Sequence, residues 1–172
     1  MVGVIESVCK EFDVPYFSCR GYPSASKVWA AGQRFIQYTE AGQAPIVLHF
    51  GDHDPSGIDM TRDIRSRLET FTDERIDVRR LALNMDQVQT YRPPPNTAKL
   101  TDSRCKQYLS IYGHESWELD ALDPVVMAKL IRDEVIGLID PVPWAERQAT
   151  EAAGRATLAS ASENWSDIVA EL

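Results

Sequence analysis

Apolar positions along this chain recur with two different periods. The first dozen residues carry Val4, Ile5, Val8 and Phe12 at the three- and four-residue spacing of an amphipathic helix. By contrast, "PIVLHFG" at 45–51 is a short apolar run with β-branched residues, bounded by proline and glycine, which is typical of a buried strand. Both signals return further along the sequence, so we expect helices and strands to be mixed.

Strand-like and helix-like segments alternate through most of the chain. Besides 45–51, strands are expected at 16–19, 76–83 and 117–122. Helices are expected at 24–42, 56–71, 84–91, 102–111 and 123–139. Strands joined by helical crossovers predict an α/β domain with a mainly parallel sheet over residues 1–140, followed by a helical tail at 141–172.

The composition is that of a soluble globular protein. Hydrophobic residues make up 44% of the 172 residues and charged residues 26%, which is ordinary for one domain with its own core. No apolar run approaches the length that crosses a bilayer, and the first residues lack the features of a signal peptide. We therefore predict a cytoplasmic protein without a membrane partner. The three scattered cysteines, Cys9, Cys19 and Cys105, are interpreted as buried reduced thiols.

The net charge of −8 gives the chain no general attraction for nucleic acid. It does not exclude such a partner, because the local field near a site decides binding. Arginines do gather in two places, around 62–67 and 75–80. We interpret both groups as solvated helix and strand faces that neighbouring acidic residues balance.

The most informative stretch is "HFGDHDPSGIDM" at 49–60, where the clearest strand ends. Asp52 and Asp54 are two positions apart, so on an extended backbone their side chains point to one side and His53 to the other. At the carboxyl end of a parallel strand, two carboxylates suit Mg²⁺ or Mn²⁺ with several bound waters. The alternative is a solvated turn whose aspartates cap backbone amides.

Three neighbours of the aspartates have predicted roles of their own. Ser56 is expected to cap the helix that follows, and Gly57 to let the backbone approach a ligand closely. His49 shows no metal-ligand spacing and is interpreted as a core histidine whose hydrogen bonds are satisfied.

"GDHDPSGI" resembles the Asp-x-Asp motif of TOPRIM domains, the metal-binding fold of type IA and type II topoisomerases, bacterial primases and OLD-type nucleases. The form Asp-x-Asp-Pro-x-Gly, with "RGYPS" at 20–24, resembles the A subunit of topoisomerase VI and its meiotic double-strand-break relatives in particular. "KLTDSR" and "WELDAL" resemble features of related phage and bacterial proteins. The resemblance covers about residues 2–138. It implies a Rossmann-like sheet flanked by helices, Mg²⁺ on Asp52 and Asp54, and metal-assisted cleavage or rejoining of DNA.

The chain departs from the family pattern in two respects. The family's glutamate, at the end of a first strand, has no counterpart, because the sequence starts inside the following helix and Glu6 is in the helical register. We therefore expect either a fragment of a longer protein or a late start. The family's nucleophilic tyrosine lies on a preceding winged-helix domain, which is expected on a partner chain or a missing N-terminal region. A homodimer is a further possibility.

Five other residues are candidates for the same site. Glu118 and Asp120 repeat the two-apart spacing in "WELDAL" and could supply extra acids, although a solvent-facing and capping role is the favoured interpretation. Arg20 follows the strand expected at 16–19, and Lys99 and Arg104 flank "LTDS" on a loop that could fold over the site. All three could contact phosphate, although a charged surface loop is the alternative for Lys99 and Arg104.

Three functions remain open at this stage. The first is a TOPRIM-type, Mg²⁺-binding domain that acts on DNA by phosphoryl transfer. The second is a non-catalytic binding or assembly module that lacks the glutamate. The third is a phosphohydrolase with Asp52 as nucleophile and Asp54 as acid, which rests on the spacing alone.

Overall fold

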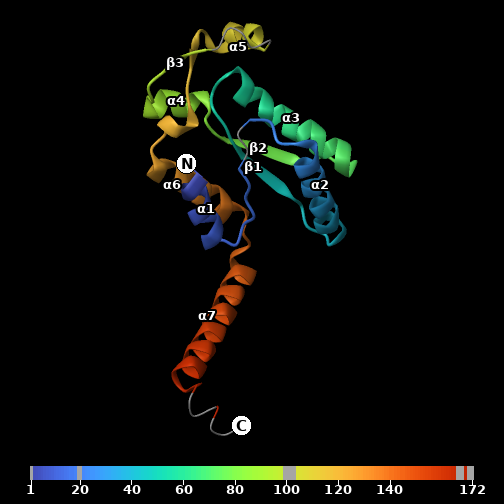
Figure 1. The fold of residues 1–172 in the computed structure, drawn as a ribbon, viewed down its shortest axis with the longest axis vertical. Coiled ribbons are helices and arrows are strands. Elements are labelled where there is room, and N and C mark those ends of the chain that lie inside the picture. Colours follow the sequence, from blue (N-terminus) through green and yellow to red (C-terminus); the bar gives the residue numbers. More distant parts are fainter. Residues whose placement is uncertain (1, 19–20, 99–103, 166–168, 170–172) are drawn as a thin grey trace. The chain divides into compact units, whose positions relative to one another are not determined.

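The computed structural model describes residues 2–18, 21–98, 104–165 and 169 (Figure 1). The strands are β1 (Ile46–Phe50), β2 (Asp77–Ala82), β3 (Asn96–Thr97) and β4 (Glu115–Ser116). The helices are α1 (Val2–Glu11), α2 (Ala25–Glu40), α3 (Pro55–Thr72), α4 (Met85–Tyr91), α5 (Cys105–Tyr112), the 3-10 helix η1 (Leu119–Ala121), α6 (Pro124–Leu138) and α7 (Pro141–Glu163). The protein is therefore mixed α/β and mostly helical.

The chain divides into two compact units, Met1–Arg132 and Asp133–Leu172. The first unit contains every described strand, and the second contains α7. α7 begins at Pro141, directly after Asp140, whose side chain accepts a hydrogen bond from the Val142 amide. The helix expected in the tail is thus present over Pro141–Glu163, and none of these residues is buried.

The parallel pair β1–β2 is the centre of the first unit. Ile46 pairs with Asp77 and His49 with Arg80, and α3 makes the crossover between the two strands. The predicted strands at 45–51 and 76–83 and the helix between them are confirmed. The second sheet is a short antiparallel pair of β3 and β4. A larger Rossmann-like sheet stays a prediction.

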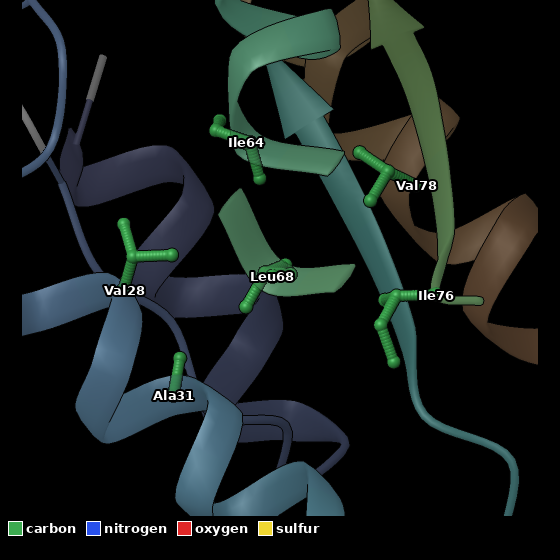
Figure 2. Close-up of a cluster of buried hydrophobic side chains, with 6 residues drawn as sticks. All are labelled: Val28, Ala31, Ile64, Leu68, Ile76 and Val78. Atoms are coloured by element: carbon green, nitrogen blue, oxygen red, sulfur yellow. The ribbon is translucent and has the colours of Figure 1, made fainter. Parts of the chain in front are cut away.

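A hydrophobic cluster joins α2 and α3 to the parallel strands (Figure 2). The buried side chains of this cluster are Val28, Ala31, Ile64, Leu68, Ile76 and Val78. Gly32 permits close contact between the helices, since a Cβ there would lie 3.2 Å from Phe71 Cβ. Burial of these side chains holds the helix pair against the strands that lead to the Asp-x-Asp segment.

Two predicted strands are wrong. Tyr16–Ser18 is not a strand, and the side chains of Tyr16 and Phe17 are exposed, because a short apolar run alone does not distinguish a strand from an extended loop. The "WELDAL" segment forms only one isolated bridge, at Trp117, and then turns into η1. Its buried residues Leu119 and Leu122 are three apart, which is the period of a 3-10 helix and not of a strand.

Other expectations from the sequence can be checked in the described residues. Cys9 and Cys105 are buried free thiols, as expected, whereas Cys19 lies outside the described residues. Among the helices of the described ranges, none combines the length and the apolar character needed to cross a membrane.

Truncation of Leu68 tests the cluster. Leu68 is 2% exposed, so Leu68→Ala should lower the free energy of unfolding by about 2–5 kcal/mol through lost burial and the cavity left behind. Leu158→Ala is the matched control, because Leu158 is 72% exposed on α7 and should lose less than about 0.5 kcal/mol. Urea unfolding followed by circular dichroism measures both, and equal losses would contradict the assignment of the core.

Candidate functional site

The Asp-x-Asp segment continues directly from β1 as extended backbone. Gly51 still pairs with the β2 side, through hydrogen bonds to Ala82 and from Leu83. His53 then pairs with Trp117 in both directions, at 2.7 and 3.0 Å. Alternation along this segment places Asp52 and Asp54 on one side and His53 on the other, where His53 is 1% exposed. The alternating burial of His53 and the two aspartates agrees with this part of the expectation, whereas the convergence of both carboxylates on one ion stays a prediction.

Asp54 is the N-cap of α3. Its Oδ1 accepts a hydrogen bond of 2.6 Å from the Gly57 amide, and the Ser56 hydroxyl donates to the same carboxylate at 3.0 Å. The prediction that Ser56 would be the cap is wrong by two residues, because Pro55 already occupies the first helical position. Ser56 supports the cap instead of forming it.

Asp52 is held by a segment far along the chain. Its Oδ1 accepts a hydrogen bond of 2.8 Å from the Leu119 amide at the start of η1. Within the described ranges, the other carboxylate oxygen of Asp52 takes part in no hydrogen bond or ion pair. One oxygen of Asp52 is thus oriented by the protein, and the second is available to a ligand.

Position 57 requires a glycine because the backbone of Asp52 lies very close to it. A Cβ at this position would lie 2.1 Å from the Asp52 carbonyl oxygen, which no side chain can occupy. The expected approach of a ligand to Gly57 stays untested. The glycine lets the first turn of α3 fold back onto the backbone of the Asp-x-Asp segment.

A half-buried arginine contacts this loop, and no local signal in the sequence indicated its role. Arg80 on β2 donates from Nη2 to the carbonyl oxygens of Gly51 at 2.7 Å and Asp52 at 2.6 Å, and from Nη1 to that of Gly57 at 2.7 Å. Burial lowers the pKa of Arg80 to about 10, and the carboxylates of Asp52 and Asp54 act in the opposite direction. Arg80 is therefore charged at neutral pH, and its interpretation as a solvated strand residue is wrong.

The buried histidines have defined partners. His49 Nδ1 lies 2.9 Å from the Thr61 hydroxyl, and burial, with the nearby charge of Arg80, lowers its pKa to about 4. The prediction of a satisfied core histidine is confirmed. The Tyr108 hydroxyl lies 2.9 Å from His53 Nδ1, while the rings of Tyr112 and Trp117 contact the same imidazole edge-on. Burial and Arg80 also lower the pKa of His53.

Arg104 belongs to a polar cluster on α3. It contacts the Tyr22 hydroxyl, lies over the Tyr22 ring at 5.2 Å, and approaches Asp59 Oδ2 at 3.3 Å. Tyr22 donates to the same Asp59 oxygen at 2.7 Å. Tyr22 of the "RGYPS" motif and Arg104 are thus brought together next to the beginning of α3. Arg20 and Lys99 lie outside the described residues.

Glu118 and Asp120 lie on either side of Leu119, whose amide binds Asp52. They are not at the end of a strand, contrary to the prediction. Asp120 is in η1 and Glu118 precedes it, and both side chains are exposed. Over the described ranges, no three histidine, cysteine or acidic side chains gather into a metal-binding group.

The donor set fits one kind of metal ion. Two carboxylates, one with an uncommitted oxygen, suit a hard cation such as Mg²⁺ that keeps most of its waters. Structural Zn²⁺ sites instead take four ligands that are mostly cysteine and histidine.

Comparisons with known proteins add no relative. No family model, no curated protein and no solved structure matches the chain.

Replacement of Arg80 tests the constraint on the loop. Arg80→Lys keeps the charge but removes the planar fork that reaches several carbonyls, so we expect a loss of about 2–4 kcal/mol in the free energy of unfolding. The neighbouring Arg79→Lys is the control, because Arg79 is paired with Asp77 on the surface and should lose less than about 0.5 kcal/mol. A stable Arg80→Lys protein in urea unfolding would show that the carbonyls do not depend on the guanidinium.

Proposed function

We propose that this chain is a TOPRIM-type domain that binds Mg²⁺ or Mn²⁺ through Asp52 and Asp54 and acts on DNA. The observation that carries the proposal is the uncommitted carboxylate oxygen of Asp52, on the same side of an extended segment as Asp54, where β1 ends. A parallel strand end is where α/β proteins bind ligands. Support also comes from the sequence resemblance of "GDHDPSGI".

The chemistry assigned to the site is phosphodiester cleavage or rejoining. A bound divalent ion would neutralise charge on the phosphate oxygens as they exchange. The protein contributes two carboxylates whose positions are set by main-chain amides before any ligand arrives. Arg104 adds a guanidinium near the start of α3, where a phosphate of the same DNA could be contacted.

A second candidate is a non-catalytic module in which the aspartates have only structural roles. Asp54 caps α3 and Asp52 binds the Leu119 amide, so each carboxylate has a main-chain partner without any ion. Arg80 further compensates their negative charge. The domain would then bind DNA or another chain without breaking bonds.

Calorimetric titration with Mg²⁺ and Mn²⁺ separates the two candidates. Asp52→Asn and Asp54→Asn remove a charge but keep an oxygen that accepts the same amide, so both variants should stay folded and lose the binding heat. Asp86→Asn, an exposed acid on α4, is the charge-matched control and should bind as the wild type does.

The alanine variants complete the comparison. Asp54→Ala and Asp52→Ala should each also lose about 1 kcal/mol in the free energy of unfolding, because an amide loses its acceptor. Identical heats for the wild type and both asparagine variants, with a stability loss only in the alanine variants, would support the structural role and overturn the metal site.

DNA binding is tested by fluorescence anisotropy with a short duplex at low salt, with Mg²⁺ or with EDTA. Because the chain is acidic, we expect binding only with Mg²⁺, and a several-fold loss in Arg104→Gln. Arg155→Gln on α7 is the control, since Arg155 is also paired with a carboxylate. Equal duplex affinity with EDTA and Mg²⁺ would contradict a metal-dependent site.

Nicking of a supercoiled plasmid then distinguishes an enzyme from a binding module. Hydrolysis of p-nitrophenyl phosphate would indicate a phosphohydrolase instead.

A further inference from the structure

The residue between the two aspartates is clamped by a single segment, from α5 to η1. The His53 amide donates to the Trp117 carbonyl, and the Trp117 amide donates to the His53 carbonyl. One residue before, Asp52 binds the Leu119 amide. On the buried side, the His53 imidazole meets the Tyr108 hydroxyl. Backbone and side chain of His53 are thus fixed by the same part of the chain.

The Tyr108 hydroxyl occupies the centre of this clamp. It lies 2.9 Å from His53 Nδ1, 2.8 Å from the His53 carbonyl oxygen and 3.0 Å from the Glu115 carbonyl oxygen. A hydroxyl has one proton to donate, and both carbonyls can only accept. If Nδ1 also accepted, the single proton would face three acceptors. When Nδ1 carries a proton and donates it to the Tyr108 oxygen, the Tyr108 proton faces only the two carbonyls, and the His53 carbonyl also accepts from the Trp117 amide. The geometry therefore favours this tautomer.

We propose that Tyr108 is a positioning residue for the candidate metal site, and that it acts by holding His53 as the Nδ1–H tautomer. The Nδ1 proton goes to the Tyr108 oxygen, and the Tyr108 proton goes to a carbonyl oxygen of the clamp. This fixes the peptide from which Asp52 and Asp54 extend to the opposite side. The inference rests on the proposed function, since it assigns Tyr108 a role in cation affinity.

Tyr112 provides an internal control for ring packing. Its ring centroid lies 4.6 Å from that of His53 and 5.0 Å from that of Tyr108. Within the described ranges, its hydroxyl forms no hydrogen bond. Removal of the hydroxyl from either tyrosine therefore preserves the aromatic contacts, and only Tyr108→Phe removes a hydrogen-bond partner of His53.

The first test is calorimetric titration with Mn²⁺ of the wild type, Tyr108→Phe and Tyr112→Phe, at a temperature where urea unfolding shows all three to be folded. We expect Tyr108→Phe to raise the Kd about tenfold, as for residues that orient metal ligands, and Tyr112→Phe to leave it within about twofold. Equal Kd values for the wild type and Tyr108→Phe would overturn the positioning role alone. A flat wild-type titration would overturn the proposed function and this inference together.

The second test uses the wild-type protein without metal, so it does not depend on whether Tyr108→Phe folds. Nitrogen-15 correlation spectra of the imidazoles, with His53 assigned by loss of its signals in His53→Asn, should show the Nδ1–H tautomer of His53 in the wild type. A purely structural role of the tyrosine ring would not require this tautomer. A wild-type spectrum with the proton on Nε2 would overturn the proposal even if Tyr108→Phe failed to fold.

Discussion

The half-buried guanidinium of Arg80 makes the hydrogen bonds on which the candidate site depends. It stands on β2, yet the carbonyls that it binds belong to the loop between β1 and α3. Carbonyl oxygens that converge away from water are costly without donors, and a planar cation supplies several donors at once. Arg80 therefore supplies hydrogen-bond donors to the carbonyls of this loop, as the amides of a neighbouring strand do within a sheet. It also places a positive charge beneath two adjacent carboxylates, which explains how their repulsion is tolerated.

The loop is held from a second direction by residues 108–119. Here the contacts are main-chain pairing at Trp117, the amide of Leu119, and the Tyr108 hydroxyl. These partners lie in α5, at the isolated bridge of Trp117 and in η1, all distant in sequence from the aspartates. Together with Arg80 they leave the Asp-x-Asp segment little freedom to rearrange. Such rigidity is what a preorganised ion site needs, because the carboxylates are oriented before a ligand is bound.

Much of the first unit could be predicted from local patterns. The strands at β1 and β2, their parallel pairing through α3, and the opposed directions of His53 and the aspartates follow from periodicity and from proline and glycine positions. The partners of the site could not be predicted in this way. Arg80 looks like any arginine of a half-exposed strand, and nothing local links Leu119 to Asp52. The segment at 117–122 was misassigned because a single bridge followed by a 3-10 turn has almost the same composition as a short strand.

The same electrostatics explain why metal and DNA binding would depend on each other at this site. Asp52 and Asp54 carry two negative charges and Arg80 one positive charge, so the group has only one net negative charge with which to attract a cation. The attraction for a hydrated ion is therefore weaker than that of two carboxylates without the arginine. A phosphate beside the ion would add to this attraction, because it brings negative charge to the ion and interacts favourably with the guanidinium group of Arg104. Coupling of this kind is reciprocal, so whatever Mg²⁺ adds to the affinity for DNA, DNA adds to the affinity for Mg²⁺. A purely structural pair of caps would show no such coupling, since its carboxylates would have no ligand to share.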